Sequence, residues 1–322
     1  MASIGVTAEE LGRMLYDSLH EKLMKLPDET LVYPAHGAGS MCGKNLSKDT
    51  VSTIGEQKKV NYALQPMSKD EFIRLVAAEQ PRAPRYFAYD AKLNRSERGV
   101  LDDVLEELVA IPIDRALELA SEKKAQIVDT RDAEDWAAGH LRGAFHIGLE
   151  GKYATWAGTI LDASRPIIVL TDEGKEREAA MRLGRIGFDR ILGWIDGGIG
   201  AVARRQDLFA VVERVNPGDL AKRLAPEAVV IVDVRTEKEF EGGHAVGAVN
   251  LPLDRLAEGL EDLPRDRTLA LQCRTGYRSA VAASLLERAG FARLLDQRGG
   301  FVAWSEAGCP VEAVVGGGGC TR

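Results

Sequence analysis

The sequence predicts an α/β protein with two tandem domains, each a parallel sheet flanked by helices, after a partial and mostly helical N-terminal segment. The chain has 322 residues, enough for two or three domains with cores of their own. An internal duplication fills its second part, since Asp129 and Arg131 recur as Asp233 and Arg235 at an offset of 104 residues. Each copy alternates short β-branched runs with helical stretches, which is typical of βα units.

The composition is that of an ordinary globular protein, with 45% hydrophobic and 28% charged residues. A net charge of −7 argues against binding of nucleic acid or of an anionic membrane as a main role. The sequence contains neither an apolar run long enough to span a membrane nor a basic, hydrophobic leader. The cysteines are too few and too scattered for a disulfide framework, and we expect a cytoplasmic protein; they are Cys42, Cys273, Cys309 and Cys320.

The N-terminal segment is predicted to contain two capped helices. Thr7 and Glu10 form a capping box, and the helix that follows, ending near Pro27, carries leucines at a spacing of four: Leu11, Leu15, Leu19 and Leu23. A short strand is expected at residues 31–33. A second capping box, Ser68 and Glu71, opens an amphipathic helix with apolar positions at Phe72, Leu75 and Val76.

Glycines recur every few residues between positions 37 and 43, after a histidine, His36, that is a candidate metal ligand. Residues 1–95 resemble the C-terminal end of a metallo-β-lactamase-fold persulfide dioxygenase, which implies that His36 corresponds to one iron ligand. The His-x-His-x-Asp-His cluster that this family also needs is absent from the sequence. His36 is therefore an orphan ligand, and we predict neither a metal site nor a cofactor. We expect a shortened form of a longer fusion, or a gene that has lost its dioxygenase half.

The parent domain would bury the apolar faces of this segment. We therefore hypothesise that the leucine stripe of residues 11–23 pairs with a second copy of the chain, giving a homo-oligomer.

We predict that residues 96–111 form a linker. The two copies of the duplication are predicted to form domains at residues 112–208 and 209–316, and residues 317–322 to form a flexible tail. His140 and His244 obey the same offset of 104 residues. Glycine pairs near the end of each copy, 197–198 and 299–300, match as well. These landmarks predict that both copies have the same fold.

The chemistry is expected at Cys273. This residue ends an apolar, strand-like run, and a turn containing Gly276 and an Ala- and Leu-rich helical stretch follow it. Backbone N–H groups of such a turn, at the positive end of the next helix, favour a thiolate and a bound anion. Arg274 and Arg278 add positive charge. A free cysteine is most often a small buried hydrophobe, but a core cysteine needs neither the turn nor the two arginines.

The pattern Cys-x-x-Gly-x-Arg between strand and helix resembles the active loop of rhodanese-type sulfurtransferases. The resemblance covers roughly residues 112–314 and implies two rhodanese-like domains in tandem, with a Cys273 that accepts sulfane sulfur as a persulfide. Phosphatases and arsenate reductases on the same fold have one more residue in this loop. Because only four residues separate Cys273 from Arg278, the tighter loop favours one bound sulfur over a tetrahedral oxyanion.

Each loop residue has an expected role. Cys273 is the nucleophile, and the backbone N–H groups of residues 274–278 hold the outer sulfur of the persulfide. Arg278 fixes the loop and adds positive potential, while Arg274 attracts the sulfonate end of thiosulfate. Thr275 and Tyr277 line the mouth and tune the choice of acceptor.

Ser279 is expected to cap the helix that follows the loop. Cys309 is expected to be a packed thiol. Cys320 is interpreted as an incidental cysteine of the tail, with a disulfide to Cys273 as the alternative.

Asp233, Arg235 and His244 are expected to support the loop structurally. Asp233 and Arg235 should form an ion pair with a nearby acidic residue, Glu237 or Glu239. A packing role is favoured for His244, because His140 occupies the same place in the copy without the cysteine.

The first copy has no cysteine in the corresponding loop. Aligning Arg177 with Arg278 places Asp172 opposite Cys273, and Glu173 adds a second carboxylate that repels an anionic donor. We therefore predict that the first domain, with Asp in place of Cys, is inactive.

The sequence as a whole indicates a sulfurtransferase of the thiosulfate sulfurtransferase type. Sulfur would pass from thiosulfate or glutathione persulfide through Cys273 to a thiol or cyanide, in sulfide or persulfide detoxification. One alternative is the C-terminal part of an iron-dependent persulfide dioxygenase–rhodanese fusion. Another is a persulfide carrier that does not turn over.

Overall fold

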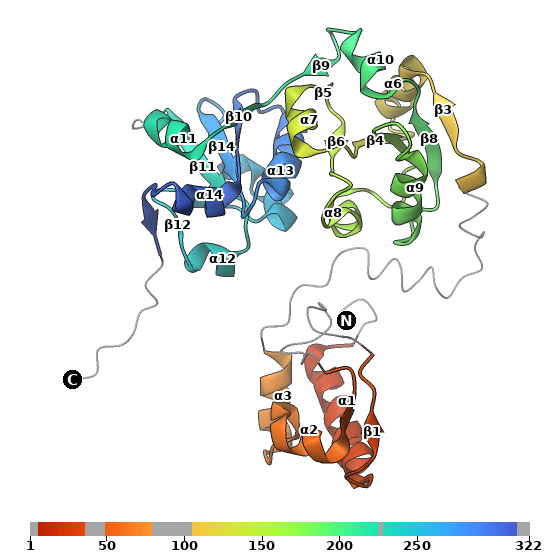
Figure 1. Ribbon diagram of the computed structural model, residues 1–322, viewed down its shortest axis with the longest axis vertical. Helices are drawn as coiled ribbons and strands as arrows, with labels where there is room; N and C mark the ends of the chain where they lie inside the picture. The colour runs from red at the N-terminus through yellow and green to blue at the C-terminus, as the bar shows by residue number, and fades with distance from the viewer. Residues whose placement is uncertain (1–5, 36–48, 79–104, 225–227, 314–322) are drawn as a thin grey trace. The chain divides into compact units, whose positions relative to one another are not determined.

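The computed structural model describes residues 6–35, 49–78, 105–224 and 228–313, which fall into two compact units, Met1–Ala83 and Pro84–Arg322 (Figure 1). Each unit has a core of its own. The expectations for His36 and Cys320 concern positions outside the described residues.

The first unit is mostly helical, as predicted. The capping box of Thr7 and Glu10 is confirmed: each backbone N–H donates to the other residue's side chain. Ser68 accepts from the Glu71 N–H at the second helix. The elements are α1 (Ala8–Glu21), a 3₁₀ turn (Leu23–Lys25), β1 (Leu31–Val32) paired antiparallel with β2 (Ser52–Thr53), α2 (Ile54–Val60), a 3₁₀ turn (Tyr62–Leu64) and α3 (Lys69–Ala77).

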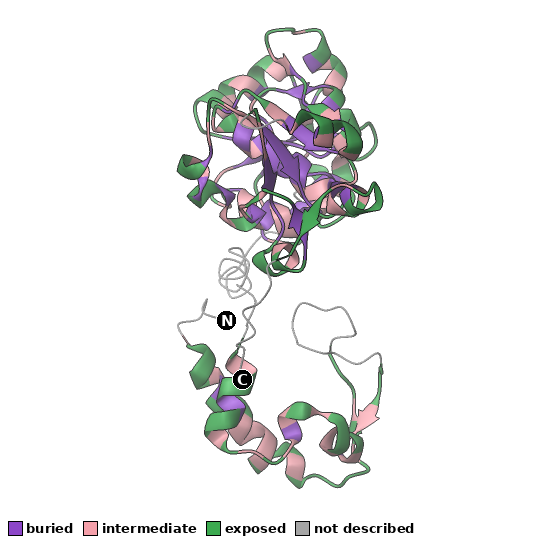
Figure 2. Ribbon diagram, turned by 90° about the vertical axis from the view of Figure 1, so that its left-hand side faces the viewer, coloured by how far each residue is buried: buried purple, intermediate pink, exposed green. Residues whose placement is uncertain are grey.

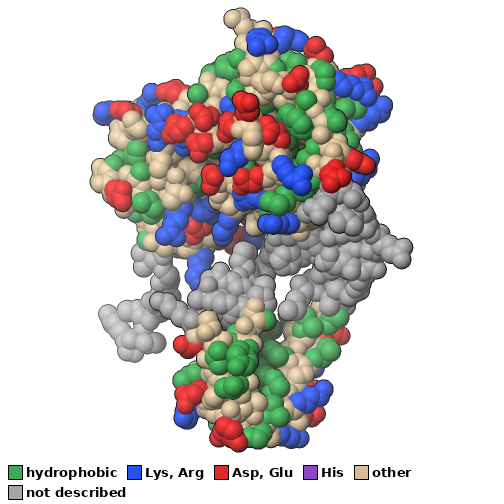
Figure 3. Space-filling model, turned by 45° about the vertical axis from the view of Figure 1, so that its right-hand side comes forward, with side chains coloured by type: hydrophobic (Ala, Val, Ile, Leu, Met, Phe, Trp, Pro, Cys, Tyr) green, Lys and Arg blue, Asp and Glu red, His purple; other side chains and the backbone are tan. Residues whose placement is uncertain are grey.

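Helices α1 and α3 pack together through a different face from the leucine stripe. Gly12 of α1 is buried and lies against the side chain of Ile73, and Phe72 is fully buried. Leu75, expected to face the core, is exposed. Apolar side chains gather on the visible face of this unit (Figure 3), and the exposed ones include Met14, Leu15, Leu23 and Leu26.

The second unit contains two five-stranded parallel sheets with the same topology. The first has the order β3-β8-β7-β4-β6 and the second β10-β15-β14-β11-β13. In chain order these are equivalent strands, so the duplication seen in the sequence is a duplication of fold. The predicted pair of parallel-sheet α/β domains is confirmed.

The first copy comprises β3 (Val109–Ile111), α6 (Ile113–Ser121), β4 (Gln126–Asp129), α7 (Ala133–Ala138), β5 (His140–Leu141), β6 (Phe145–His146), α8 (Tyr153–Ile160), β7 (Ile167–Leu170), α9 (Glu176–Gly184), β8 (Ile191–Ile195), α10 (Gly198–Ala203) and β9 (Phe209–Ala210).

The second copy comprises β10 (Glu213–Val215), α11 (Pro217–Arg223), β11 (Val229–Asp233), α12 (Glu237–Glu241), β12 (His244–Ala245), β13 (Val249–Asn250), 3₁₀ turns (Leu253–Glu258 and Leu260–Asp262), β14 (Thr268–Gln272), α13 (Tyr277–Arg288), β15 (Leu294–Gln297), α14 (Gly300–Glu306) and β16 (Val311–Glu312).

Each sheet is covered by helices on both faces, and its central strands are buried (Figure 2). In the second copy, Val232 and Leu271 face α13, whereas Ile231 and Ala270 face α11 and α14. Burial on both faces explains why these strands read as continuous apolar runs in the sequence.

The strand pairing corrects two of the predicted boundaries. β3 is an edge strand of the first sheet, so the linker that we extended to residue 111 ends before Val109. β9 pairs with β5, just as β16 pairs with β12 in the second copy, so residues 209 and 210 close the first domain rather than opening the second.

Candidate active site

Cys273 lies directly after β14, at the carboxyl end of a central parallel strand. Loops at this edge of an α/β sheet are common sites for ligands. The cysteine is 1% exposed, whereas its neighbours Arg274 and Thr275 are exposed. The sulfur therefore lies at the bottom of a short loop whose two exposed residues face solvent.

Among the described residues, two polar groups contact the sulfur of Cys273. The Gly276 N–H donates to Sγ at 3.1 Å, and the Ser279 hydroxyl oxygen lies 3.6 Å from Sγ. Gly276 has a φ of +104°, a left-handed conformation that glycine adopts readily and that lets the loop turn tightly into α13. An N–H donor at this position stabilises negative charge on sulfur.

Ser279 does not cap the helix as predicted. The N-cap of α13 is Gly276, which has no side chain to cap with, and Ser279 is the third residue of the helix, fully buried and beside the thiol. A hydroxyl there suits a contact with the reactive sulfur rather than with the helix end.

The glycine pair of residues 299 and 300 supports the loop from below. A Cβ on Gly300 would overlap the Arg274 carbonyl carbon and the Cys273 carbonyl oxygen. The Phe301 N–H donates to the Cys273 carbonyl at 2.6 Å, and the Val302 N–H donates to the Arg274 carbonyl at 3.1 Å. The first turn of α14 therefore fixes the backbone that carries the cysteine.

Arg278 is paired with a carboxylate. Both terminal nitrogens of Arg278 lie 2.8 Å from the carboxylate oxygens of Glu239, on α12. These bonds, with further hydrogen bonds from Thr236, lower the pKa of Glu239 to about 2 although partial burial opposes the shift. Arg278 therefore connects the start of α13 to α12, and Glu239 offsets much of the positive potential that we assigned to it.

The prediction that Asp233 and Arg235 form an ion pair with Glu237 or Glu239 is wrong. Arg235 bonds Asp233 itself, with Nη2 to Oδ2 at 2.6 Å, and the Gly243 carbonyl at 2.8 Å. Glu239 is taken by Arg278, and Glu237 pairs with Arg255.

His244 is held by the backbone of its own copy. Its Nδ1 lies 2.9 Å from the Phe240 carbonyl oxygen, and its ring stacks on the Phe240 ring. In the first copy His140 makes the same contacts with Trp136. The geometry repeats in a copy without the cysteine, in agreement with a packing role.

Two segments of the chain, residues 113–205 and 216–307, match the rhodanese-like domain. These segments cover more than half of the sequence. The chain belongs to the rhodanese-like family.

Named relatives match a single domain of this chain. A sulfurtransferase from Allochromatium vinosum is 36% identical over 107 residues, which is 33% of this chain and all of that protein. Thiosulfate sulfurtransferase 16, a chloroplastic protein of Arabidopsis thaliana, is 36% identical over 94 residues, 26% of this chain and 78% of its own length.

One structural neighbour is a metallo-beta-lactamase from Staphylococcus aureus. It is 27% identical and covers 57% of this chain and 49% of its own, with a TM-score of 0.47. A score at this level does not establish a shared fold, so the origin of the N-terminal unit stays a prediction.

The first rhodanese-like domain has Thr171, not Asp172, at the position of the cysteine. Strand register pairs Asp129 with Leu170 in the first sheet and Asp233 with Gln272 in the second, so the residue after each strand is equivalent. The Thr171 carbonyl also lies against Gly198, as the Cys273 carbonyl lies against Gly300.

Our alignment from the arginines was shifted because the first loop is one residue longer. Residues 171–175 separate β7 from α9, whereas residues 273–276 separate β14 from α13. The correction leaves a hydroxyl in place of the thiol.

Helix α13 of the second rhodanese-like domain also forms the contact with the first. It lies beside α7 and β6 (Figure 1). The Tyr277 hydroxyl donates to the Gly148 carbonyl at 2.7 Å, and the His146 N–H donates to the Ser284 hydroxyl at 3.0 Å. Trp136 of α7 belongs to the same buried cluster as Cys273. The helix that begins at the active loop is thus anchored in both domains.

Sequence reasoning missed two buried charged residues near the loop, Arg214 and Asp296. They lie on neighbouring strands and pair at 2.8 Å between Arg214 Nε and Asp296 Oδ2. The available signal was a charged residue directly after two leucines of a predicted strand, Asp296.

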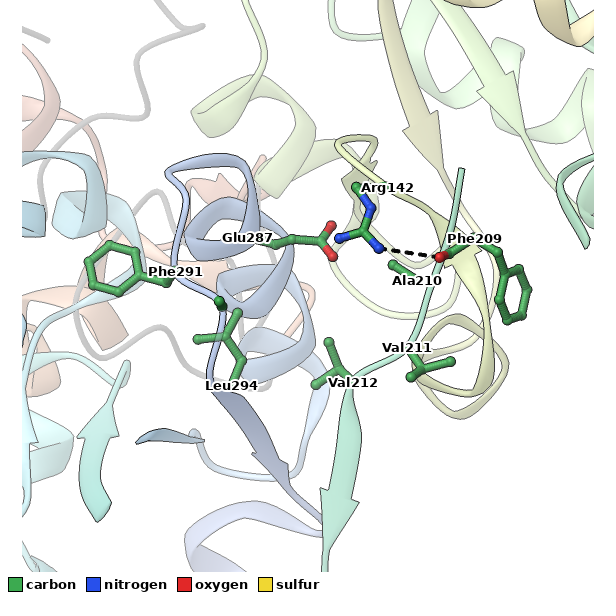
Figure 4. A pocket seen from close by; sticks show the side chains of 9 residues that line it. Arg142, Phe209, Ala210, Val211, Val212, Glu287, Phe291 and Leu294 are labelled. Atoms are coloured by element: carbon green, nitrogen blue, oxygen red, sulfur yellow. Dashed lines mark hydrogen bonds between the residues drawn. The ribbon is translucent and has the colours of Figure 1, made fainter. Parts of the chain in front are cut away.

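A cavity of about 300 Å³ lies where the segment between the two rhodanese-like domains passes the end of α13 (Figure 4). Arg142 and Glu287 face each other in it, among mainly apolar side chains. None of residues 273–279 lines it, so it is separate from the thiol.

Among the described residues, no group of three metal-ligating side chains converges. In the same residues we find no helix long and apolar enough to span a membrane.

Basic and acidic side chains are interspersed on the face of the second unit seen in Figure 3. Cys309 packs against the core that contains Trp304, in agreement with its predicted role.

Proposed function

We propose that this chain is a sulfurtransferase that carries sulfane sulfur on Cys273. The observation that supports this most directly is the Gly276 N–H at 3.1 Å from Sγ, at the start of α13 and within a loop seated on Gly300. Relatives named sulfurtransferases align with single domains of this chain, which supports the same chemistry.

The reaction has two displacements. The Cys273 thiolate attacks the outer sulfur of thiosulfate, the S–S bond of the donor breaks, and sulfite leaves with the electron pair. The product is a Cys273 persulfide with its negative charge on the terminal sulfur. A thiolate or cyanide then attacks that sulfur, and Cys273 leaves as a thiolate. Electrons and atoms balance without a cofactor.

The loop residues serve these steps through charge and access. The Gly276 N–H stabilises the thiolate in the free enzyme. Arg274 is exposed at the mouth, where its guanidinium attracts an anionic donor such as thiosulfate or glutathione persulfide. Arg278 is held by Glu239 and positions the loop.

The first rhodanese-like domain is proposed to be catalytically silent. Thr171 has no sulfur-carrying chemistry. Asp172 and Glu173 are exposed beside it and repel anionic donors.

A turnover assay tests the proposal against the carrier alternative. With thiosulfate and cyanide, an enzyme produces sulfite and thiocyanate in many equivalents, and Cys273→Ser abolishes both products. A carrier releases one equivalent of sulfite and stops. Sulfite release that survives in Cys273→Ser would overturn both forms of the proposal. Cys309→Ser is the matched control and should retain activity.

A further inference from the structure

We propose that the buried ion pair of Arg214 and Asp296 sets the reactivity of the Cys273 sulfur, with Arg214 favouring negative charge on sulfur and Asp296 opposing it. The inference rests on the proposed function only in taking Cys273 as the reacting thiol. Both are positioning residues, because each acts through another group of the loop.

The pair is built into the sheet next to the loop. Arg214 on β10 is in register with Asp296 on β15, and Asp296 is in register with Leu271, two residues before the cysteine. The Asp296 side chain is fully buried and that of Arg214 is 7% exposed. Two opposite charges held there interact more strongly than they would at the surface.

Each member of the pair reaches a contact of the thiol. A Cβ added to Gly276 would lie 3.1 Å from Arg214 Nη2, so the guanidinium packs closely against Gly276. Gly276 is the residue whose N–H donates to Cys273 Sγ. On the other side, the Ser279 hydroxyl interacts with the Asp296 carboxylate and lies 3.6 Å from Sγ. Cation and anion thus approach the sulfur through two different groups.

The Asp296 carboxylate is poorly satisfied for a fully buried charged group. Arg214 Nε lies 2.8 Å away but is poorly aligned for a hydrogen bond, and the Ser279 hydroxyl is the other donor near the carboxylate. Poorly satisfied buried groups destabilise a fold, and such groups are found at functional sites. Burial raises the pKa of Asp296 to about 6, against the lowering effects of Arg214 and Ser279.

The first rhodanese-like domain takes part through Glu134 of α7. Arg214 Nη1 lies 2.6 Å from one Glu134 oxygen, and Arg298 Nη2 lies 3.1 Å from the other. Asp296 interacts electrostatically with Arg214, Glu134 and Arg298, and by a hydrogen bond with Ser279. The charge of Arg278, an arginine of the loop, is offset by Glu239. The orientation of Arg214 therefore depends on a carboxylate of the silent domain.

The test is the pH dependence of Cys273 alkylation by iodoacetamide, quantified on the peptide that contains Cys273. In Arg214→Gln the positive charge beside Gly276 is lost, so alkylation at pH 7 should slow on the order of tenfold. In Asp296→Asn the guanidinium is no longer balanced by this carboxylate, so alkylation should accelerate. Because loss of Arg214 also removes a group that lowers the pKa of Asp296, the double variant should react like Arg214→Gln.

The pH range of the Asp296→Asn effect separates tuning from a structural role. Above about pH 6 the parent carboxylate is ionised and the variant should differ; below it the carboxyl is protonated and the difference should vanish. Arg214→Lys, which keeps the charge, should retain most of the parent rate. If both single variants shift the rate in the same direction, or Arg214→Lys loses as much rate as Arg214→Gln, the inference is wrong.

Alkylation needs no sulfur donor, so the outcome is independent of sulfur transfer. Opposite shifts in a protein that forms no persulfide would sustain the pair's role and overturn the proposed function. If the variants turn over thiosulfate and their alkylation rates are unchanged, the proposed function stands and the role of the pair is wrong. Should Arg214→Gln fail to fold, the sign and pH range of the Asp296→Asn effect still decide the matter.

Discussion

Gly300 shows how one missing side chain positions the loop that carries the Cys273 thiol. Its backbone lies against the carbonyls of Cys273 and Arg274, and its φ is +60°. The sequence marked this glycine only as a landmark of the duplication, because close approach between segments distant in sequence leaves no local pattern.

Gly300→Ala should therefore displace the loop. We expect persulfide formation to fall by about a hundredfold, since small displacements of reacting groups have effects of this size. Gly308→Ala is the matched control: its φ is +66°, but a Cβ there meets nothing within 4 Å. It should lower stability by about 1–2 kcal/mol and leave persulfide formation intact. Equal activity of the two variants would show that Gly300 does not seat the loop.

Glu239 gives the site a pH-dependent contribution to stability. Its hydrogen bonds with Arg278 lower its pKa from the ordinary value of 4.5 to about 2 in the folded protein. A depressed folded pKa stabilises the fold above the unfolded value, and this contribution is lost as the pH falls from about 4.5 towards 2. Because the pair is partly exposed, we expect about 1–2 kcal/mol rather than the full shift.

Glu239→Gln should be less stable than the parent at pH 7, and the gap should close between about pH 4.5 and 2. Thermal melting of the full chain across this range measures it. Glu237→Gln, in the same helix, removes a more exposed pair with Arg255 and should change the melting temperature little. If the difference in melting temperature between Glu239→Gln and the parent does not change with pH, the lowered pKa of Glu239 is contradicted.

At the scale of elements, α13 connects the thiol to the other domain. Its first residue, Tyr277, bonds Gly148, and its later turns contact His146 and Gly143 through Ser284 and Glu287. The sequence predicted the helix and its loop but not this interface, because helical periodicity does not specify which domain covers a face.

Tyr277→Phe removes the hydroxyl and leaves the Gly148 carbonyl without this donor. We expect a loss of about 1 kcal/mol, seen as a lower melting temperature. Tyr153→Phe is the comparison, since its hydroxyl makes a longer bond of 3.5 Å within the first domain. If Tyr277→Phe melts like the parent, the hydrogen bond does not stabilise the interface.

Alignment of the two copies by sequence alone misplaced the loop residues of the first domain by one position. Arginines at the helix starts aligned Asp172 with Cys273, whereas the strand ends align Thr171 with it. The inserted residue lies between strand and helix, where only the three-dimensional register reveals it.

Thr171→Cys in a Cys273→Ser background tests whether a thiol alone suffices. The longer loop and the carboxylates of Asp172 and Glu173 should prevent persulfide formation from thiosulfate, by mass spectrometry of the Thr171→Cys peptide. Added sulfur there would contradict the proposal that the loop itself, and not only the missing thiol, silences the first domain.

At the scale of the whole molecule, the duplication was readable because apolar strand runs and glycine pairs repeat at near-constant offsets. Buried features that join distant strands were not readable, and the Arg214–Asp296 pair is the main example. The two rhodanese-like domains share the core around Trp136 and Cys273, so the first domain helps to form the surroundings of the thiol.

The central claim, that Cys273 carries sulfur, is tested most directly by peptide mass spectrometry after mixing the full chain with thiosulfate. We predict one added sulfur on the peptide that contains Cys273, absent in Cys273→Ser and retained in Cys309→Ser. No added sulfur on Cys273, from thiosulfate or from glutathione persulfide, would contradict the account.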